Sequence, residues 1–311
     1  MSLSVNKVSK RYGNKWALRD VSFTVEPGET VAIFSELAES GSAILKLIAL
    51  KEDPNGGSID VAGFSSRLIS NDSDGASFLG LKISKRDDSE RKLDLDEISS
   101  LPENSLVLLD SPFEGAFKTD RSAIGDAIKT AVSNGSSAAI FSTRDFKDSI
   151  EFADRVVVIL NSYVEQNAAP QEIYDRPASL AVASVVGRNN LITARRLTST
   201  KNDIPEFVTI DGEHRLFAQR TEKAALGALN KNVTLAIRPE QISISFGASF
   251  PEDNLLKATV TEVKPLGPTT RVTLDCGGLK LEALVLRLVG LDIGEECMVG
   301  LPPDRIAVLA N

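Results

Sequence analysis

A strand, a short loop and an apolar helix near the N-terminus constrain this chain more than any other feature. The pattern fills residues 30–49. It is the arrangement of a phosphate-binding loop, in which G-x-x-x-x-G-K-[ST] connects the strand to the helix. Here Ser35 and Ser40 occupy the glycine positions, Gly41 occupies the lysine position, and only Ser42 matches. The sequence therefore predicts the scaffold of a nucleotide site without its main cation.

The segments on both sides of this loop carry further motifs in a defined order. Tyr12 lies between two strand patterns, and residues 27–29 read Pro-Gly-Glu before the loop. Residues 106–110 (Leu-Val-Leu-Leu-Asp) are similar to a Walker B strand, and Asp145 follows Ser-Thr-Arg in the position of a switch region. With the exit segments near 172–192, these motifs resemble ATP-binding subunits of ABC importers of the maltose, glycerol-phosphate, polyamine and iron type. The resemblance covers most of the chain.

Strand and helix patterns alternate up to Gly187, which favours an α/β layer with a largely parallel sheet. Strands are expected at 3–8, 21–25, 30–34, 106–109, 138–142 and 155–160, and helices near Ser42, Lys118, Asp148 and Pro170. The first three strands are expected to form an antiparallel edge. The resemblance implies an ABC-type nucleotide-binding core, a mixed sheet with flanking helices and a shortened helical subdomain, over residues 1–187.

After Gly187 the pattern changes to short β-rich runs separated by turn signals. These runs lie at 207–210, 232–237, 241–246, 256–263, 270–275, 280–285, 297–301 and 305–309. Residues 236–240 (Ala-Ile-Arg-Pro-Glu) and 261–267 resemble the TOBE regulatory domain of the same importers. The expected second domain is a β-barrel, OB-like or TOBE in type, over 188–311.

Composition restricts the possible partners. The 311 residues carry a formal net charge of −8, which argues against nucleic acid or an anionic membrane as the main partner. No stretch approaches the ~18 consecutive apolar residues of a membrane span, and the first residues have no apolar signal core. Cys276 and Cys297 are isolated, which is typical of reduced cytoplasmic thiols. Contact with a membrane is therefore expected only through an embedded partner.

The resemblance implies a set of residues for ATP hydrolysis, and this chain has other residues at the corresponding positions. Gly41 replaces the lysine that neutralises phosphates, while the carboxylates of Glu36 and Glu39 lie nearby. Ser111 follows Asp110 where a glutamate would polarise water, and serine is too weak a base. Asp110 could hold magnesium, or it could be a strand-end residue satisfied by its neighbours.

Two further catalytic parts and the signature are absent as well. The first glutamine in the chain is Gln166, too late for the glutamine loop. Arg144 stands in place of the switch histidine and cannot accept a hydrogen bond, and the only histidine, His214, is expected to be a solvated turn residue. The signature position, near residues 86–90, is charged and has no glycine, which opposes phosphate binding. We therefore predict no catalytic residues and no metal site.

A residual nucleotide contact remains possible in this interpretation. Tyr12 would stack on adenine, or equally pack against the edge strand, and backbone amides would touch phosphate. The cofactor is then none, or ATP bound weakly without hydrolysis. The residual binding residues are Tyr12, Ser40, Gly41, Ser42, Ala43 and Asp110.

Two functions follow from these observations. The favoured hypothesis is a degenerate, non-hydrolysing subunit that pairs with a second, competent ABC ATPase subunit and docks on integral-membrane permease subunits. It would be cytoplasmic and peripheral on the inner face of the cell membrane. The alternative is a soluble regulatory or scaffold protein that uses the TOBE domain to bind a ligand or regulator. The resemblance points to sugars, polyols such as glycerol or its phosphate, polyamines or iron as cargo, in that order.

Overall fold

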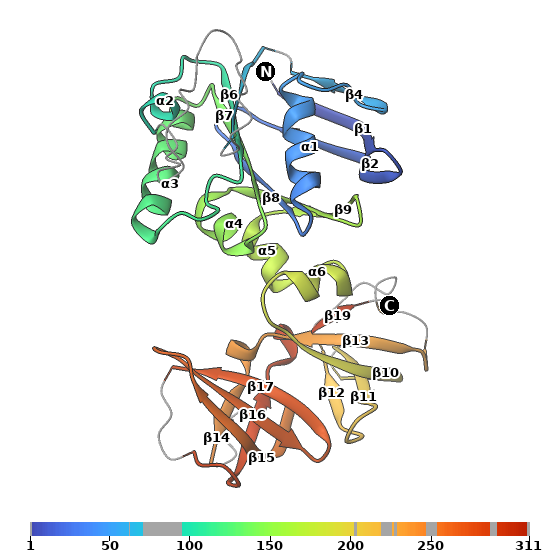
Figure 1. The fold of residues 1–311 in the computed structure, drawn as a ribbon. Coiled ribbons are helices and arrows are strands. Elements are labelled where there is room, and N and C mark those ends of the chain that lie inside the picture. The colour runs from blue at the N-terminus through green and yellow to red at the C-terminus, as the bar shows by residue number, and fades with distance from the viewer. Residues whose placement is uncertain are drawn as a thin grey trace. The chain divides into compact units, whose positions relative to one another are not determined.

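A computed structural model describes residues 2–61, 63–70, 95–201, 204–218, 226, 229–246, 254–286 and 291–309. The chain forms two compact units, Met1–Ile173 and Tyr174–Asn311 (Figure 1). The sequence pattern placed the boundary after Gly187, whereas the structure groups residues 174–187 with the second unit. The expected signature segment at 86–90, and with it most of the shortened helical subdomain, lies outside the described residues.

The first unit is built on a six-stranded mixed sheet in the order β5-β6-β7-β3-β8-β9. Its strands are β3 (Thr30–Ser35), β5 (Ser65–Ser70), β6 (Ser105–Asp110), β7 (Ala138–Thr143), β8 (Arg155–Leu160) and β9 (Tyr163–Ala168). All neighbouring pairs are parallel except β8 and β9. Every residue of β3, β6 and β7 is buried, because a parallel sheet is covered on both faces.

A second, three-stranded sheet of the first unit is antiparallel throughout. It contains β2 (Lys15–Val25), β1 (Leu3–Tyr12) and β4 (Gly56–Asp60) in that order. The expectation that the third strand joins this edge is wrong. Thr30–Ser35 instead pairs with β7 and β8, since its uninterrupted apolar run needs cover on both faces and an edge strand would leave one face exposed.

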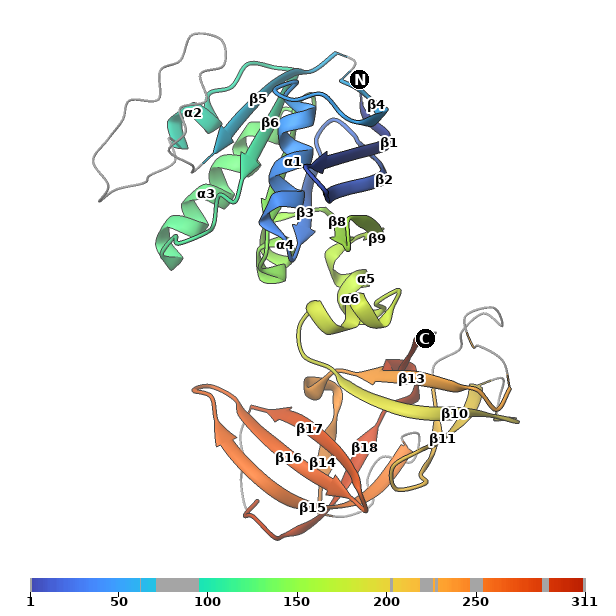
Figure 2. The same cartoon turned by 45° about the vertical axis from the view of Figure 1, so that its right-hand side comes forward.

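Helix α1 (Ala38–Ile48) packs between the two sheets of the first unit (Figure 2). Its side chains share one apolar cluster with residues of β1, β2, β3, β6, β7 and β8. A helix that is buried on nearly all sides needs an apolar sequence, as found here. The remaining helices are α2 (Leu95–Ser99), α3 (Lys118–Val132), α4 (Phe146–Phe152) and α5 (Pro170–Asp175).

The second unit is an antiparallel β domain of two five-stranded sheets that share one core. One sheet has the order β12-β11-β10-β13-β19 and the other β14-β18-β15-β16-β17. The strands are β10 (Asn190–Lys201), β11 (Ile204–Thr209), β12 (Arg215–Phe217), β13 (Asn232–Ile237), β14 (Ser243–Ser245), β15 (Asn254–Pro265), β16 (Thr270–Cys276), β17 (Leu279–Val285), β18 (Glu296–Leu301) and β19 (Ala307–Leu309). One helix, α6 (Leu180–Val185), and the short 3-10 helices η1 (Pro239–Gln241) and η2 (Pro303–Arg305) complete the described part.

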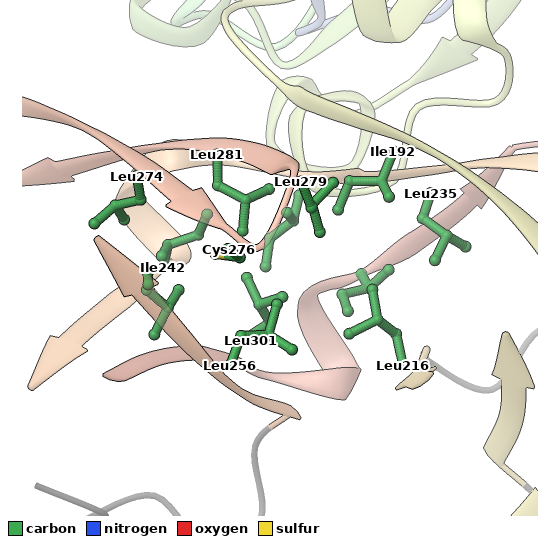
Figure 3. Close-up of a cluster of buried hydrophobic side chains, with 14 of the residues drawn as sticks. Ile192, Leu216, Leu235, Ile242, Leu256, Leu274, Cys276, Leu279, Leu281 and Leu301 are labelled. Atoms are coloured by element: carbon green, nitrogen blue, oxygen red, sulfur yellow. The ribbon is translucent and has the colours of Figure 1, made fainter. Parts of the chain in front are cut away.

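Alternation of buried and exposed residues builds the core of this unit. Along β16, Val272, Leu274 and Cys276 point inward and are buried, as expected for a strand with one wet face. Figure 3 shows Leu274 and Cys276 in the same cluster as apolar side chains of other strands, among them Leu256 and Leu301. The predicted fold class, a mixed α/β core followed by a curled antiparallel β domain, is confirmed.

The single histidine takes part in this packing. His214 is half-buried, and its Nε2 atom lies 2.5 Å from the carbonyl oxygen of Cys276. The contact joins the turn at Gly212 to the turn at Gly277, where a Cβ on Gly212 would lie 2.5 Å from the imidazole. The expectation of a solvated turn residue is therefore corrected, because the partner comes from a distant hairpin.

Candidate functional site

The carboxyl ends of three neighbouring parallel strands meet at one edge of the first unit's large sheet. They carry Ser35 at the end of β3, Asp110 at the end of β6 and Ser142 near the end of β7. Ligand sites of open α/β sheets lie at this edge. The structure therefore brings the loop after β3 and Asp110 to the same edge of the sheet.

The loop between β3 and α1 contains only two residues, Glu36 and Leu37. Helix α1 already begins at Ala38, and the amide of Ser40 donates to the carbonyl of Leu37 at 3.0 Å. Amides beyond the first turn of an α-helix donate within the helix. The amides of Ser42 and Ala43 are therefore engaged in the helix. The sequence pattern placed the helix start near Ser42, one turn later.

Gly41 is packed against strand β7. A Cβ atom at Gly41 would lie 2.9 Å from Cβ of Ser142 and 3.5 Å from Oγ of Ser35. Real Cβ atoms do not approach a side-chain carbon that closely, so any larger residue here requires the helix or β7 to shift. The position that corresponds to the phosphate-binding lysine is occupied by direct helix–strand packing.

Asp110 is satisfied inside this cluster. It is 7% exposed, and it accepts a hydrogen bond of 2.6 Å from the hydroxyl of Ser142. The same hydroxyl oxygen accepts a 2.8 Å bond from the amide of Ser111. The two readings of Asp110 left open by the sequence are thus a magnesium ligand or a satisfied strand-end carboxylate, and the hydroxyl contact has the geometry of the second.

Ser40 and Ser42 differ in their surroundings. Ser40 is buried, and its hydroxyl donates to the carbonyl of Ala17 in β2 at 2.9 Å. It therefore fastens α1 to the three-stranded sheet. Ser42, two residues further along α1, is half-buried. Ala43 is buried in the apolar cluster of the first unit.

Tyr12 lies at the end of β1 and is 43% exposed. Its hydroxyl donates to Glu52 at 2.7 Å, and the ammonium of Lys10 lies 5.4 Å from the ring centroid while also pairing with Glu52 at 2.9 Å. Burial, together with the hydrogen bond and the negative charge of Glu52, raises the pKa of Tyr12. One partner of the ring is therefore already a lysine on the same strand.

The segment in the switch position is held by polar contacts. Arg144 forms an exposed ion pair with Glu114, and Asp145 caps α4 by accepting from the amide of Lys147 at 3.0 Å. Behind it, Asp148 is 3% exposed, accepts from Thr143 at 2.6 Å and pairs with Arg121. Sequence reasoning missed Asp148, because a carboxylate on a short helix gives no sign that it will be buried.

The charged side chains beside the first turn of α1 are carboxylates. Helix α1 has one basic residue, Lys46, and it lies in the last turn, whereas Glu36 and Glu39 are exposed beside the first. Gly41 has no space for a longer side chain toward β7. Among the described residues, no group of three His, Cys, Asp or Glu side chains could hold a metal ion.

In the second unit the principal polar cluster is built around one buried arginine. Arg238 is 2% exposed, and its guanidinium donates to the carbonyls of Tyr174, at 2.6 Å from Nη2, of Arg188, at 3.1 Å, and of Val186. The same group lies 3.9 Å from the centroid of the Tyr174 ring. Burial lowers the pKa of Arg238, although arginine stays charged at any physiological pH.

Tyr174 and Gly187 complete this cluster. The Tyr174 hydroxyl donates to Glu240 at 2.5 Å, and burial followed by that carboxylate raises the pKa of Tyr174 to about 12. Gly187 adopts φ +70, and a Cβ there would lie 3.0 Å from the tyrosine ring. The cluster therefore fixes the segment 174–188 to strand β13 and η1. Arg238 belongs to the sequence motif at 236–240, but the motif by itself does not indicate that this arginine is buried.

Comparison with known proteins places these two units in context. Residues 235–309 match the family model of the TOBE domain. The iron(III) import ATP-binding protein FbpC 2 of Pectobacterium atrosepticum is 24% identical, over 92% of this chain and 93% of that protein. The sulfate/thiosulfate import ATP-binding protein CysA of Pseudomonas putida is 26% identical, over 95% of each chain. The sn-glycerol-3-phosphate import ATP-binding protein UgpC 2 of Agrobacterium fabrum is 26% identical, over 98% of this chain and 89% of that protein.

Over most of its length the chain is similar to ATP-binding subunits of ABC importers, and residues 235–309 are similar to the TOBE domain. The TOBE match begins within β13 and ends with β19, so it includes Arg238 and Glu240 but not β10 to β12. The similarity to the importer subunits also spans the edge with the degenerate loop. No helix in the described part of the chain combines the length and apolar character that a bilayer span requires.

Proposed function

We propose that this chain is a non-hydrolysing ATP-binding-cassette subunit of a binding-protein-dependent importer. It pairs with a catalytically competent ATPase subunit and docks on permease subunits at the inner face of the cell membrane. The near full-length similarity to import ATP-binding proteins and the TOBE match support the importer part of the proposal. The proposed cargo is a sugar first and a polyol such as glycerol or its phosphate second; one relative, UgpC 2, is named for the import of sn-glycerol-3-phosphate.

The observation that carries the non-hydrolysing part is the packing of Gly41 against Ser142. Phosphate binding needs a cation and free amides at the start of this helix. A glutamate about 6 Å from a phosphate charge costs about 2–3 kcal/mol at an effective dielectric constant near 20. The helix N-terminus stabilises each phosphate charge by only about 0.3–1 kcal/mol. Exposed Glu36 and Glu39 therefore outweigh the dipole unless they turn away.

The hydrolysis machinery offers no replacement for the missing groups. Ser111 follows Asp110 in place of a glutamate, and its hydroxyl oxygen lies 3.5 Å from that of Ser142. Arg144 pairs with Glu114 and carries no lone pair to orient a water molecule. Under this proposal the partner subunit supplies the lysine, the glutamate and the histidine of the working site.

Nucleotide contact is proposed to be weak. Tyr12 retains an exposed ring that could meet a base, but Lys10 and Glu52 already bind it. The amides of Gly41, Ser42 and Ala43 lie within a helix that starts at Ala38. We therefore expect ATP to bind, if at all, through its base rather than through its phosphates.

Phosphate release by the purified chain tests the absence of hydrolysis. With Mg·ATP present, the expected turnover equals that of the Asp110→Asn variant, because Asp110 is engaged by Ser142 and a serine rather than a glutamate follows it in the sequence. Turnover above background that disappears in Asp110→Asn would contradict the proposal.

Recovery of partners from the native membrane tests the importer role separately. A tagged chain, solubilised in mild detergent, is expected to bring down two permease subunits and an ATPase subunit with an intact phosphate-binding lysine. Loss of the permeases under these conditions would favour the alternative, a regulatory or scaffold protein that acts through its TOBE domain. This result does not depend on the turnover assay.

A further inference from the structure

Four side chains form a continuous arginine–aromatic ladder on the first unit: Arg11, Trp16, Arg19 and Tyr163. The guanidinium carbon of Arg11 lies 5.7 Å from the centroid of Trp16, and that of Arg19 lies 5.3 Å from it. Arg19 is also 5.7 Å from the centroid of Tyr163, and its Nη1 donates to the tyrosine hydroxyl at 3.3 Å. Both arginines are exposed, Trp16 is half-buried, and Tyr163 is 42% exposed.

The backbone holds the ladder in place. Arg11 is opposite Trp16 in the β1–β2 register, so both side chains lie on one face. The amide of Arg19 donates to the carbonyl of Ser162 at 2.7 Å, and the Ser162 hydroxyl donates to the carbonyl of Trp16 at 2.8 Å. Ser162 has φ +74, which is unfavourable for serine and is offset by these two bonds. The turn before β9 is therefore fixed so that Tyr163 lies beside Arg19.

The two guanidinium groups have no carboxylate partner among the described residues. The ion pairs found in that part of the chain involve other arginines and lysines. This is notable because the chain has more acidic than basic residues, 43 against 35. A guanidinium has five donors in a planar fork that matches a carboxylate. Most of the ladder's donors therefore remain available to an acceptor from another molecule.

We propose that the ladder is a docking surface for an acidic segment of a partner protein, with Arg11 and Arg19 binding its Asp or Glu side chains. Arginine, tryptophan and tyrosine are the residue types that contribute most to protein–protein binding, and here they are adjacent. The net charge of −8 disfavours a polyanionic nucleic acid as the occupant, whereas a short acidic segment meets only the local positive charge. The ladder includes none of the strand-end residues Ser35, Asp110 and Ser142, and the proposal does not depend on the proposed function.

Trp16 is the only tryptophan of the chain, so its fluorescence reports on the ladder directly. The full chain is titrated with a decaglutamate peptide at low ionic strength, and decaglutamine is the uncharged control. We expect a saturable change in Trp16 emission with decaglutamate only. Because exposed charges are screened by salt, the dissociation constant should rise as salt is added.

Single Arg11→Gln and Arg19→Gln variants are each expected to bind decaglutamate about 3-fold more weakly, and the double variant about 10-fold. Arg305→Gln is the matched control, since it removes one charge from a half-exposed arginine of the second unit. It should bind like the parent chain. Equal binding by the parent and the double variant overturns the proposal, as does a stronger Trp16 response to oligodeoxythymidine or to phosphatidylserine vesicles than to decaglutamate.

Discussion

Buried charges of opposite sign lie at the centres of two polar clusters, one at the strand ends of the first unit and one around Arg238 in the second unit. In the first, a buried carboxylate, Asp110, is satisfied by the neutral hydroxyl of Ser142 without any cation. In the second, a buried cation, Arg238, donates to backbone carbonyls, and the carboxylate of Glu240 accepts from the Tyr174 hydroxyl. The partner of the buried carboxylate is thus a neutral hydroxyl, and the partners of the buried cation are backbone carbonyls.

Despite this difference in charge, both buried groups have hydrogen-bond partners inside the protein. Buried polar groups in folded proteins are hydrogen-bonded. Asp110 and Arg238 are both hydrogen-bonded within the protein, and we expect both clusters to stabilise the fold. Four substitutions, described from the largest expected effect to the smallest, test the roles of these two clusters.

The largest effect is expected for Arg238→Ala. The substitution leaves three carbonyl groups without their donor and removes a side chain that packs on Tyr174. We expect a loss of about 3–4 kcal/mol in the free energy of unfolding of the second unit, measured by urea denaturation of the full chain. Arg305→Ala, at an exposed position, should cost less than about 0.5 kcal/mol. Similar costs for the two variants would remove the structural role of Arg238.

Gly41→Lys restores the missing cation and tests whether the first cluster can still become a phosphate site. Because a Cβ at this position would lie 2.9 Å from Ser142, we expect a loss of about 2 kcal/mol in the free energy of unfolding and no tight binding of a fluorescent ATP analogue. Ala38→Lys adds the same charge at an exposed position of the first turn and should leave stability almost unchanged. Micromolar ATP binding by Gly41→Lys would show that only the lysine was missing.

Ser142→Ala tests the neutral satisfaction of Asp110. It removes the donor to the carboxylate and the acceptor for the amide of Ser111, so we expect a cost of about 1.5 kcal/mol in the free energy of unfolding. Ser149→Ala is the matched control, because Ser149 is equally buried and its hydroxyl has no hydrogen-bond partner. That variant should be neutral or slightly stabilised. The reverse order of the two costs would contradict the role given to Ser142.

The smallest effect is expected for Tyr174→Phe, which removes the hydrogen bond to Glu240 at a cost of about 0.5–1 kcal/mol near neutral pH. The pKa of Tyr174 is raised from 10.0 to about 12, so the folded state holds this proton more tightly than the unfolded state. The resulting stability is fully present below about pH 10 and is lost as the pH rises toward 12. Unfolding measured on both sides of pH 10 should show a shallower alkaline loss in the variant. An equal loss of stability above pH 10 in the parent chain and in Tyr174→Phe would show that Tyr174 is not the group responsible.

Secondary structure was predictable wherever one residue pattern dominated. The helices at Lys118 and Pro170 and the strand at 232–237 begin where their patterns begin. The long strand β10 was missed, because Arg195 and Arg196 interrupt the alternation that identifies a strand. Its pairing with β11 and β13 defines it instead. Similarly, β9 has a mostly polar sequence and is set by its pairing with β8.

The candidate site was predictable in its chemistry and not in its geometry. The absence of a lysine at Gly41 and of a glutamate at Ser111 is readable from residue types alone. That α1 begins at Ala38, one turn before the expected position, depends on tertiary contacts. The hydroxyl of Ser40 bonds Ala17, and Gly41 packs on Ser142, so contacts with two distant strands stabilise the extra turn.

The sequence by itself determined the order of the elements, the change from an α/β pattern to a β pattern, and the residue types at the loop and strand-end positions, among them Gly41 and Ser111. Each of these depends on residue identity or short-range periodicity. Only the tertiary structure decided that Ser142 engages Asp110, that Arg238 binds the carbonyls of residues 174–188, and that Arg19 lies beside Tyr163. These contacts join residues far apart in the chain, and their partners are chosen by packing and by the need to satisfy buried polar groups, which no local pattern encodes.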